Sequence, residues 1–138
     1  MTNQEIRNLL KKHNLRATTA RVGVFYALIH TERPLSHSEL VHKLSEMYGD
    51  QATIYRTLIT FVDREIIRVA SNVGGIARYE CIDLEHKSKN VHPHFVCKAC
   101  GIVSCLPKTT IIHTLDEAWK DILYNSEIQF LGTCQDCA

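Results

Sequence analysis

The sequence predicts an α+β protein made of two parts: a helical part that ends in a β-hairpin, and a cysteine-rich part of short strands and one helix. Three observations support this division. Apolar residues repeat at helical spacing as far as Val62, two β-like runs follow, and five of the six cysteines lie beyond residue 90. We expect units at 1–82 and 92–138, joined by a polar linker at 83–91.

The composition excludes two broad classes of protein. The chain has 138 residues, of which 45% are hydrophobic and 22% charged, close to an ordinary globular protein. A disordered chain would lack apolar residues and carry a high net charge. No uninterrupted apolar run approaches the roughly 20 residues that cross a bilayer, so we expect no membrane partner. The charged start of the sequence leaves no apolar stretch for a signal peptide, and we expect a cytoplasmic protein.

Charge divides the chain in the same way. The formal net charge is only +1, but residues 1–82 carry 11 Lys and Arg against 8 Asp and Glu. Residues 83–138 carry 5 against 7. The small net charge therefore hides a mildly basic first part and a slightly acidic second part.

Four helices are expected in the first part, each with its apolar residues on one face. Ser36 and Glu39 form a capping box at the start of the third helix, and Asp50 is a good N-cap for the fourth. The residues expected to face inward are Ile6, Leu9, Leu10 and His13, then Val22, Phe25 and Ile29, then Leu40, Val41, Leu44 and Met47, and finally Ile54, Leu58, Phe61 and Val62. The outer face of the fourth helix is expected to carry Thr53, Arg56, Thr57, Thr60 and Arg64, with Tyr55 at the boundary.

A β-hairpin is expected after the helices. The runs Ile66–Ala70 and Ala77–Ile82 are β-like, and the segment between them contains two consecutive glycines. Helices followed by a two-stranded wing have the outline of a winged helix.

The second part should contain three short strands, at His92–Cys97, Gly101–Leu106 and Ile128–Leu131. An amphipathic helix is expected at 109–124, between the last two strands. Its inward residues would be Ile112, Leu115, Trp119, Ile122 and Leu123.

Two CxxC pairs, Cys97–Cys100 and Cys134–Cys137, predict a structural metal site. Two residues between cysteines let both thiolates reach one metal, and four thiolates at about 2.3 Å form a closed tetrahedral zinc site. Disulfides and a thioredoxin-like redox pair are the alternatives. Reducing conditions argue against disulfides, and a redox pair normally begins a helix in a βαβ unit. We therefore predict structural Zn²⁺.

A histidine pair, His92 and His94, lies just before the first CxxC pair. On a strand, alternate residues face one side, so both imidazoles would converge into a second metal site. Surface histidines without a ligand role are the alternative. Further donors lie nearby, although Cys81 and Cys105 could equally be buried packing residues. These donors are Glu80, Cys81, Asp83, Glu85, His86 and Cys105.

Four sequence blocks together resemble the ferric uptake regulator (Fur) family of bacterial metal-sensing repressors. They are Leu-Arg-Ala-Thr-Thr-Ala-Arg at 15–21, Ala-Thr-Ile-Tyr-Arg-Thr-Leu at 52–58, His-Pro-His-Phe-Val-Cys-Lys-Ala-Cys-Gly at 92–101 and Gly-Thr-Cys-Gln-Asp-Cys at 132–137. The resemblance implies an N-terminal winged helix-turn-helix domain and a small C-terminal α/β dimerisation domain with a four-cysteine zinc site. It further implies a homodimer that binds double-stranded operator DNA in response to a metal, with no small-molecule substrate and no enzymatic activity.

The same resemblance assigns DNA-binding residues. Tyr55 and Arg56 match the recognition-helix pair, Thr53 lies in the same block, and Arg16 matches a basic residue near the minor groove. Arg56 could reach a guanine edge or a phosphate, and Tyr55 could pack on a thymine methyl group. A solvated helix charge is the alternative for Arg56. The structural zinc ligands implied by the resemblance are Cys97, Cys100, Cys134 and Cys137.

The implied regulatory metal site departs from the family pattern in two places. The N-terminal histidine of the family falls at Pro34, with His37 three residues later, and Cys105 stands where the family usually offers a carboxylate. Carboxylate and imidazole ligands suit Fe²⁺ or Mn²⁺, and a thiolate shifts the preference toward Zn²⁺. We expect Zn²⁺ or Fe²⁺, with Mn²⁺ less favoured. The ranked ligands are His92, His94, Glu80, Cys105 and His37.

The resulting hypothesis is a metal-dependent transcriptional repressor that controls metal homeostasis. A peroxide sensor that releases DNA when Cys105 or a ligand histidine is oxidised is one alternative. A zinc enzyme is another, although no HExxH or His-x-Glu signature accompanies the histidine pair. A winged-helix module that binds proteins would show no salt-dependent binding to DNA.

Overall fold

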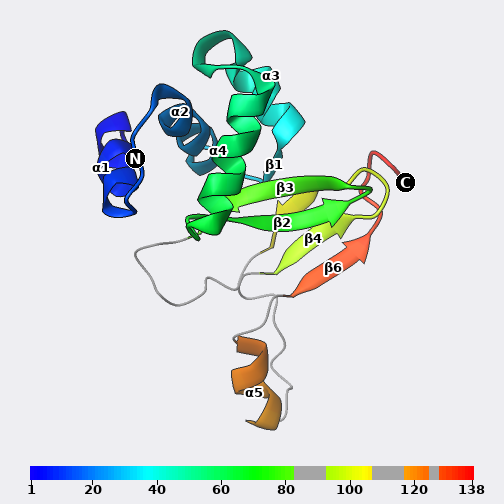
Figure 1. Cartoon of the computed structure of the whole chain (residues 1–138). Helices are drawn as coiled ribbons and strands as arrows, with labels where there is room; N and C mark the ends of the chain where they lie inside the picture. Colours follow the sequence, from blue (N-terminus) through cyan, green and yellow to red (C-terminus); the bar gives the residue numbers. More distant parts are fainter. Residues whose placement is uncertain (83–92, 107–116, 125–127) are drawn as a thin grey trace.

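The computed structural model describes residues 1–82, 93–106, 117–124 and 128–138. Over these ranges the chain forms two three-stranded sheets, and helices α1–α4 lie on one side of the first sheet (Figure 1). The second sheet lies on the side of the first that faces away from these helices. The α+β class and the order of helices before the hairpin are as predicted.

Local signals in the sequence determine where the helices begin. Thr2 and Ser36 each form a capping box with the glutamate three residues later. The carboxylate of Asp50 accepts a hydrogen bond from the backbone N–H of Thr53 at 2.8 Å. The helices are α1 (Asn3–Lys12), α2 (Thr19–Ile29), α3 (His37–Tyr48) and α4 (Gln51–Asp63).

The helical core largely follows the predicted apolar faces. Phe25 of α2 and Phe61 of α4 meet edge to face at its centre, with ring centroids 6.1 Å apart. Helix α2 is buried on more than one side, because α1, α3, α4 and β3 all contact it. The inward stripes predicted for α1 and α4 are confirmed at Ile6, Leu10, Ile54, Leu58 and Phe61, which are fully buried.

Several positions in the helices differ from the pattern. Met47, expected to face inward, is 71% exposed at the end of α3. Leu28, which was not predicted to face inward, is in the core. The residues expected to face inward that are only partly buried are Leu9, His13, Ile29, Val41 and Val62. Thr57 was expected on the outer face of α4 but is buried. Its hydroxyl can be buried at little cost, because it donates a hydrogen bond to the carbonyl of Thr53 at 2.9 Å instead of to water.

The hairpin is the wing of a winged helix. Strand β2 (Ile67–Val73) pairs antiparallel with β3 (Ile76–Cys81). Strand β2 runs further than the predicted Ile66–Ala70, whereas β3 is shifted by one residue from the predicted Ala77–Ile82. Only Gly74 and Gly75 form the turn, with φ of 60° and 79°, the left-handed values that a tight hairpin turn requires. An unpredicted strand, β1 (Leu35–Ser36), pairs with the other edge of β3 and connects α3 to the wing.

The second sheet has the order β5-β4-β6, with β4 (His94–Cys97) in the centre. Strand β5 (Val103–Cys105) runs antiparallel to β4, and β6 (Gln129–Gly132) runs parallel to it. The predicted linker 83–91, His92 and the inward residues Ile112 and Leu115 lie outside the described residues.

Helix α5 (Glu117–Tyr124) stands apart from both sheets (Figure 1). Its predicted inward residues Trp119 and Ile122 are 53% and 54% exposed, so that prediction is wrong for the single chain. An amphipathic pattern identifies an apolar face but does not identify its partner, and the described residues of this chain do not cover it. None of the described helices is both long and apolar enough to cross a membrane.

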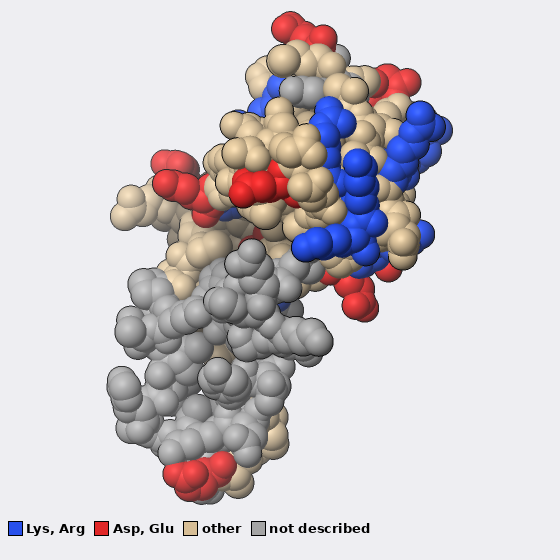
Figure 2. All heavy atoms as spheres, turned by 90° about the vertical axis from the view of Figure 1, so that its left-hand side faces the viewer, with Lys and Arg blue, Asp and Glu red and all other residues tan. Residues whose placement is uncertain are grey.

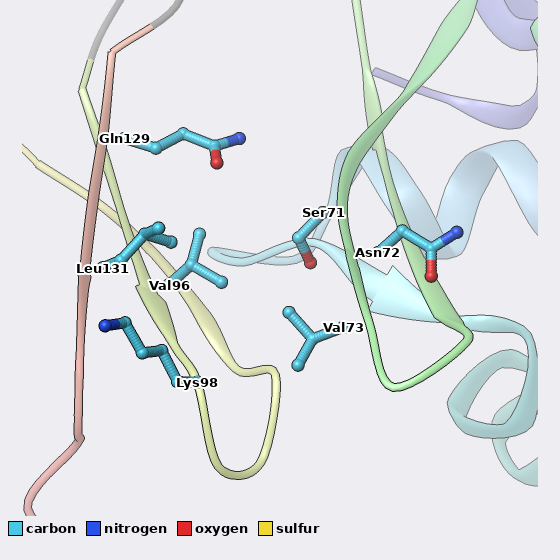
Figure 3. Close-up of a pocket in the computed structure, with 7 residues that line it drawn as sticks. All are labelled: Ser71, Asn72, Val73, Val96, Lys98, Gln129 and Leu131. Atoms are coloured by element: carbon cyan, nitrogen blue, oxygen red, sulfur yellow. The ribbon is translucent and has the colours of Figure 1, made fainter.

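The wing and the second sheet are in direct contact. The Gln129 side-chain amide donates to the carbonyl of Ala70 at 3.3 Å, and Arg78 donates to the carbonyl of Cys100 at 3.4 Å. A cavity of about 460 Å³ lies between the two elements (Figure 3). It is lined by Ser71, Asn72, Val73, Val96, Lys98, Gln129 and Leu131.

Candidate metal centres and DNA-binding helix

The parallel pairing of β4 with β6 brings the two CxxC pairs together. Cys97 ends β4 opposite Gly132, which ends β6, so the two following loops leave the sheet side by side. The backbone N–H of Cys134 donates to the sulfur of Cys97 at 3.4 Å. Gly101, directly after the first pair, has a φ of 77° and lets the chain turn back into β5.

The four sulfurs of Cys97, Cys100, Cys134 and Cys137, which we call the four-cysteine cluster, fit one tetrahedral ion. They all lie within 4.8 Å of one another, and Cys100 Sγ is 3.8 Å from Cys134 Sγ. With metal–sulfur bonds of about 2.3 Å, tetrahedral zinc has sulfur–sulfur edges of about 3.8 Å. All six cysteines of the chain are free thiols. The predicted convergence of the two CxxC pairs is therefore observed, in an arrangement that fits a structural zinc site.

The shifted pKa values of the cysteines in this cluster also favour a bound cation. Backbone N–H groups of Cys100 and Cys134 lower the pKa of Cys97 to about 6, because they stabilise its thiolate. The sulfurs of Cys134 and Cys100 raise the pKa of Cys137 to about 12. Four thiolates cannot share this space without a neutralising charge, which a divalent metal would supply.

A second cluster of potential ligands joins the wing to the second sheet. It contains Glu80 of β3, His94 of β4 and Cys105 of β5, whose ligand atoms all lie within 4.8 Å of one another. His94 and Cys105 are opposite each other in the β4–β5 register. The imidazole of His94 is fully buried, and its Nε2 is 3.4 Å from Oε2 of Glu80. We call these three residues the Glu-His-Cys cluster.

An arginine on the neighbouring strand contributes to the charge of this cluster. Arg68 lies opposite Glu80 in the β2–β3 register, and its Nε donates to Oε1 of Glu80 at 2.7 Å. Burial alone would raise the pKa of Glu80, but contacts with His94 and Arg68 outweigh it and lower this pKa. Partial burial and the negative charge of Glu80 raise the pKa of Cys105. Without a metal, the cluster therefore holds a carboxylate beside a protonated thiol.

The remaining regulatory candidates are placed differently. His92 lies outside the described residues. Cys81 packs against the helical core, and burial raises the pKa of its thiol to about 12, so it behaves as a packing residue. His37 is not part of the Glu-His-Cys cluster. It lies at the start of α3, where its Nε2 donates to the carbonyl of Gln51 at 2.9 Å and its ring meets Tyr55 edge to face, with centroids 5.6 Å apart.

The candidate DNA-binding residues lie on the helical part. Tyr55 is 50% exposed and Arg56 is exposed on α4, whereas Thr53 is partly covered. Arg16 is exposed before α2, and its carbonyl accepts a hydrogen bond from Arg21 at 3.0 Å. Figure 2 views the side that carries α1 and shows Lys and Arg side chains gathered along one edge of the helical part.

Two arginines that the sequence did not single out contact these sites. Arg68 contacts a candidate ligand, and Arg78 contacts the loop of the four-cysteine cluster. The contact of Arg68 with Glu80 could be inferred from the rule that opposite charges pair across a hairpin, but this inference requires the strand register. No local pattern connects Arg78 with Cys100, because 22 residues separate them.

Comparison with known proteins agrees with this arrangement. The sequence profile of the Ferric uptake regulator family matches residues 12–128. The chain belongs to the ferric uptake regulator family. The ferric uptake regulation protein of Bacillus subtilis is 22% identical over an alignment of 138 positions. This alignment covers 96% of this chain and 91% of that protein.

Solved structures of Fur-family regulators share the fold. The Helicobacter pylori ferric uptake regulator Fur, described as having three functional metal-binding sites, matches with a TM-score of 0.70 and 19% identity over 99% of this chain and 94% of its own. A zinc uptake regulator solved in complex with zinc and DNA matches with a TM-score of 0.59 and 20% identity over 99% of this chain and 95% of its own.

Membership of the Fur family fixes the general function. Members of this family are metal-responsive, DNA-binding transcription regulators and not enzymes, so the zinc-enzyme alternative is excluded.

Proposed function

We propose that this chain is a homodimeric repressor that binds operator DNA when the Glu-His-Cys cluster holds a divalent metal ion. Zn²⁺ is the preferred ion and Fe²⁺ the second candidate. The proposal includes a DNA-binding unit at 1–82, a dimerisation unit at 92–138, and Zn²⁺ in the four-cysteine cluster as a structural ion.

The main support for the proposal is that the residues of the Glu-His-Cys cluster come from two different sheets. Glu80 belongs to the wing, whereas His94 and Cys105 belong to the second sheet. Shared ligation by these residues would fix the wing, and the helices attached to it, relative to the dimerisation unit. If this arrangement matches the spacing of an operator, metal and DNA favour the same state, with a coupling of typically about 1–3 kcal/mol.

The donor set supports Zn²⁺ over Mn²⁺. One carboxylate, one imidazole and one thiol include a soft ligand, and thiolates favour zinc over the oxygen-preferring ions. We propose His92, two residues before His94, as a further ligand, as the family resemblance implies. His37 is the weakest candidate, since its Nε2 already bonds to Gln51.

For DNA contact we propose the exposed end of α4. Arg56 and Tyr55 would read bases in the major groove, with Thr53 beside them and Arg16 near the minor groove. Asp50 caps α4 and leaves the first turn of the helix well ordered for this role.

Homodimer formation is supported by exposed apolar side chains in the second part. Trp119, Ile122, Phe130 and Leu131 are 53%, 54%, 44% and 60% exposed on α5 and β6. Large apolar side chains left exposed on two elements of the same part are typical of surfaces that a partner covers. Sedimentation analysis of Trp119→Glu should show monomers, whereas Met47→Glu, an exposed apolar control on α3, should stay dimeric. A dimeric Trp119→Glu protein would contradict this surface.

The proposed function is tested by metal-dependent DNA binding. The probe is a duplex selected from a random pool by the zinc-loaded protein, and gel shifts are titrated with Zn²⁺, Fe²⁺ and Mn²⁺. His94→Ala should lose most of the metal dependence, and His30→Ala, an exposed histidine at the end of α2, should keep it. Unchanged metal dependence in both His92→Ala and His94→Ala would remove the proposed sensing site.

A peroxide sensor is the second candidate. Without a bound metal, the raised pKa of Cys105 argues against it, because a protonated thiol reacts slowly with peroxide. Mass spectrometry after mild peroxide treatment decides between the two. Oxidation at Cys105 or at a ligand histidine, together with release of DNA, would favour the sensor.

A further inference from the structure

Arg68 and Glu80 form the closest charged pair beside the Glu-His-Cys cluster. The two residues face each other across the β2–β3 hairpin. Nε of Arg68 is 2.7 Å from Oε1 of Glu80, and Nη2 contacts the same oxygen. The guanidinium therefore uses two of its nitrogens on a single carboxylate oxygen.

The two oxygens of Glu80 have different neighbours. Oε1 faces Arg68, whereas Oε2 faces the imidazole of His94 at 3.4 Å. The side chain of Glu80 is only 13% exposed, so little water reaches it to replace these contacts. Oε2, which contacts His94, is therefore the oxygen of Glu80 that Arg68 leaves available to the Glu-His-Cys cluster.

We propose that Arg68 is a positioning residue that sets the metal preference of the cluster by restricting Glu80 to one coordinating oxygen. This inference depends on the proposed function, because it concerns the same regulatory site. With Oε1 held by Arg68, Glu80 supplies one oxygen donor and cannot chelate with both. A small donor set of oxygen, nitrogen and sulfur suits four-coordinate Zn²⁺. Mn²⁺ favours six-coordinate sites rich in oxygen ligands, which a second Glu80 oxygen would help to build.

Arg68 also brings a permanent positive charge, and this effect must be separated from positioning. A guanidinium stays protonated at all ordinary pH values and repels every divalent cation alike. Removal of the charge should therefore raise the affinity for Zn²⁺ and Mn²⁺ by a similar factor. Removal of the positioning should change the ratio of the two affinities. The ratio, and not either affinity alone, is the informative quantity.

The experiment compares metal ratios in the full-length protein. After the four-cysteine cluster has been filled with zinc, the second site is titrated with Zn²⁺ and with Mn²⁺ against competing chelators. Arg68→Met keeps the length of the side chain and removes its donors, and Arg68→Ala is a second test. Arg33→Met is the matched control, since Arg33 holds Glu39 in another Arg–Glu pair at 2.7 Å.

We expect the Zn²⁺ preference over Mn²⁺ to fall at least about tenfold in both Arg68 variants, the lower end of the effects of losing an outer-shell partner. The Arg33→Met ratio should equal that of the wild type. Equal ratios in the Arg68 variants and the wild type overturn the inference, even if both affinities rise.

The visible spectrum of Co²⁺ in the second site gives a second readout, which does not depend on the affinity ratio. The wild-type protein should show the intense visible bands of four-coordinate Co²⁺ with a sulfur-to-metal charge-transfer band, and Arg68→Met should show the weak bands of a higher coordination number. Weak six-coordinate bands in the wild type overturn the inference. A wild-type chain that takes up no second ion overturns the proposed function itself, so the two failures are distinguishable.

Discussion

Arg78, on the wing strand β3, donates a hydrogen bond to the carbonyl oxygen of Cys100, 3.4 Å away in the loop of the four-cysteine cluster. The same guanidinium contacts the carboxylate of Glu39 in α3 at 3.0 Å. A side chain at Gly101 would place its Cβ 3.3 Å from Cβ of Val73, so this loop lies closely against the wing. One arginine therefore connects the helical part with the candidate zinc site.

Replacement of Arg78 by methionine should destabilise the protein. The side chain of Arg78 is 12% exposed, and the loss of its hydrogen bonds to a carboxylate and a carbonyl should lower the free energy of unfolding by about 1.5–3 kcal/mol. Urea denaturation at fixed zinc content measures this difference. Arg64→Met is the control, because Arg64 is exposed and bonds to the carbonyl of His13. Equal losses in both variants would contradict a special role for Arg78.

Glu39 should make stability depend on pH in the acidic range. Burial would raise its pKa, but hydrogen bonds from Arg33 and from the backbone of Ser36, with the charges of Arg33 and Arg78, lower it to about 2. A lowered pKa in the folded state contributes stability that is fully present above about pH 4.5 and is lost as pH falls toward 2.

This contribution can be isolated with matched variants. Between pH 5 and 2, Glu39→Gln should lose less stability than the wild type, since it has no carboxylate to protonate. Glu46→Gln, an exposed position on the same helix, should follow the wild-type curve. Thermal unfolding at a series of pH values checks both. Parallel curves for Glu39→Gln and the wild type would show that this carboxylate contributes nothing.

Much of the fold is predictable because its signals are local. The capping boxes, the N-cap Asp50 and the apolar faces of α1 and α4 need only neighbouring residues. Strand β1 is not predictable in this way, because two residues carry no periodicity and the strand exists through pairing with β3. The prediction fails at Trp119 and Ile122 because a pattern shows that a face is apolar and not what covers it.

The candidate sites divide in the same way. The four-cysteine cluster is predictable because each CxxC pair is a local motif and zinc needs two of them. The Glu-His-Cys cluster depends on three strands, and its arginine neighbour Arg68 becomes visible only with the β2–β3 register. His37 is a candidate ligand by its place in the sequence, although its imidazole contacts α4.

Metal content should separate the two clusters. Cys134→Ser removes a thiolate from the four-cysteine cluster and should lower both the bound zinc and the melting temperature strongly, because binding by structural zinc sites contributes directly to folding. Cys105→Ser should retain the structural zinc equivalent and lose affinity at the second site. Elemental analysis of protein purified without chelator, combined with thermal unfolding, measures both. Loss of all metal from the Cys105→Ser protein would contradict the expectation that the two clusters bind metal independently.

His37 should support DNA binding without serving as a metal ligand. Its Nε2 bonds to the carbonyl of Gln51 and its ring packs against Tyr55, so it orders the first turn of α4 and the proposed base-reading tyrosine. His37→Ala should weaken operator binding about two- to tenfold, the effect of losing roughly 0.5–1.5 kcal/mol from one hydrogen bond. Metal affinity should stay unchanged, because the Glu-His-Cys cluster does not include His37. Fluorescence anisotropy with labelled duplex and chelator competition give the two values, with exposed His42→Ala as the control on the same helix. A His37→Ala protein that loses metal affinity and DNA affinity together would instead make this histidine a ligand.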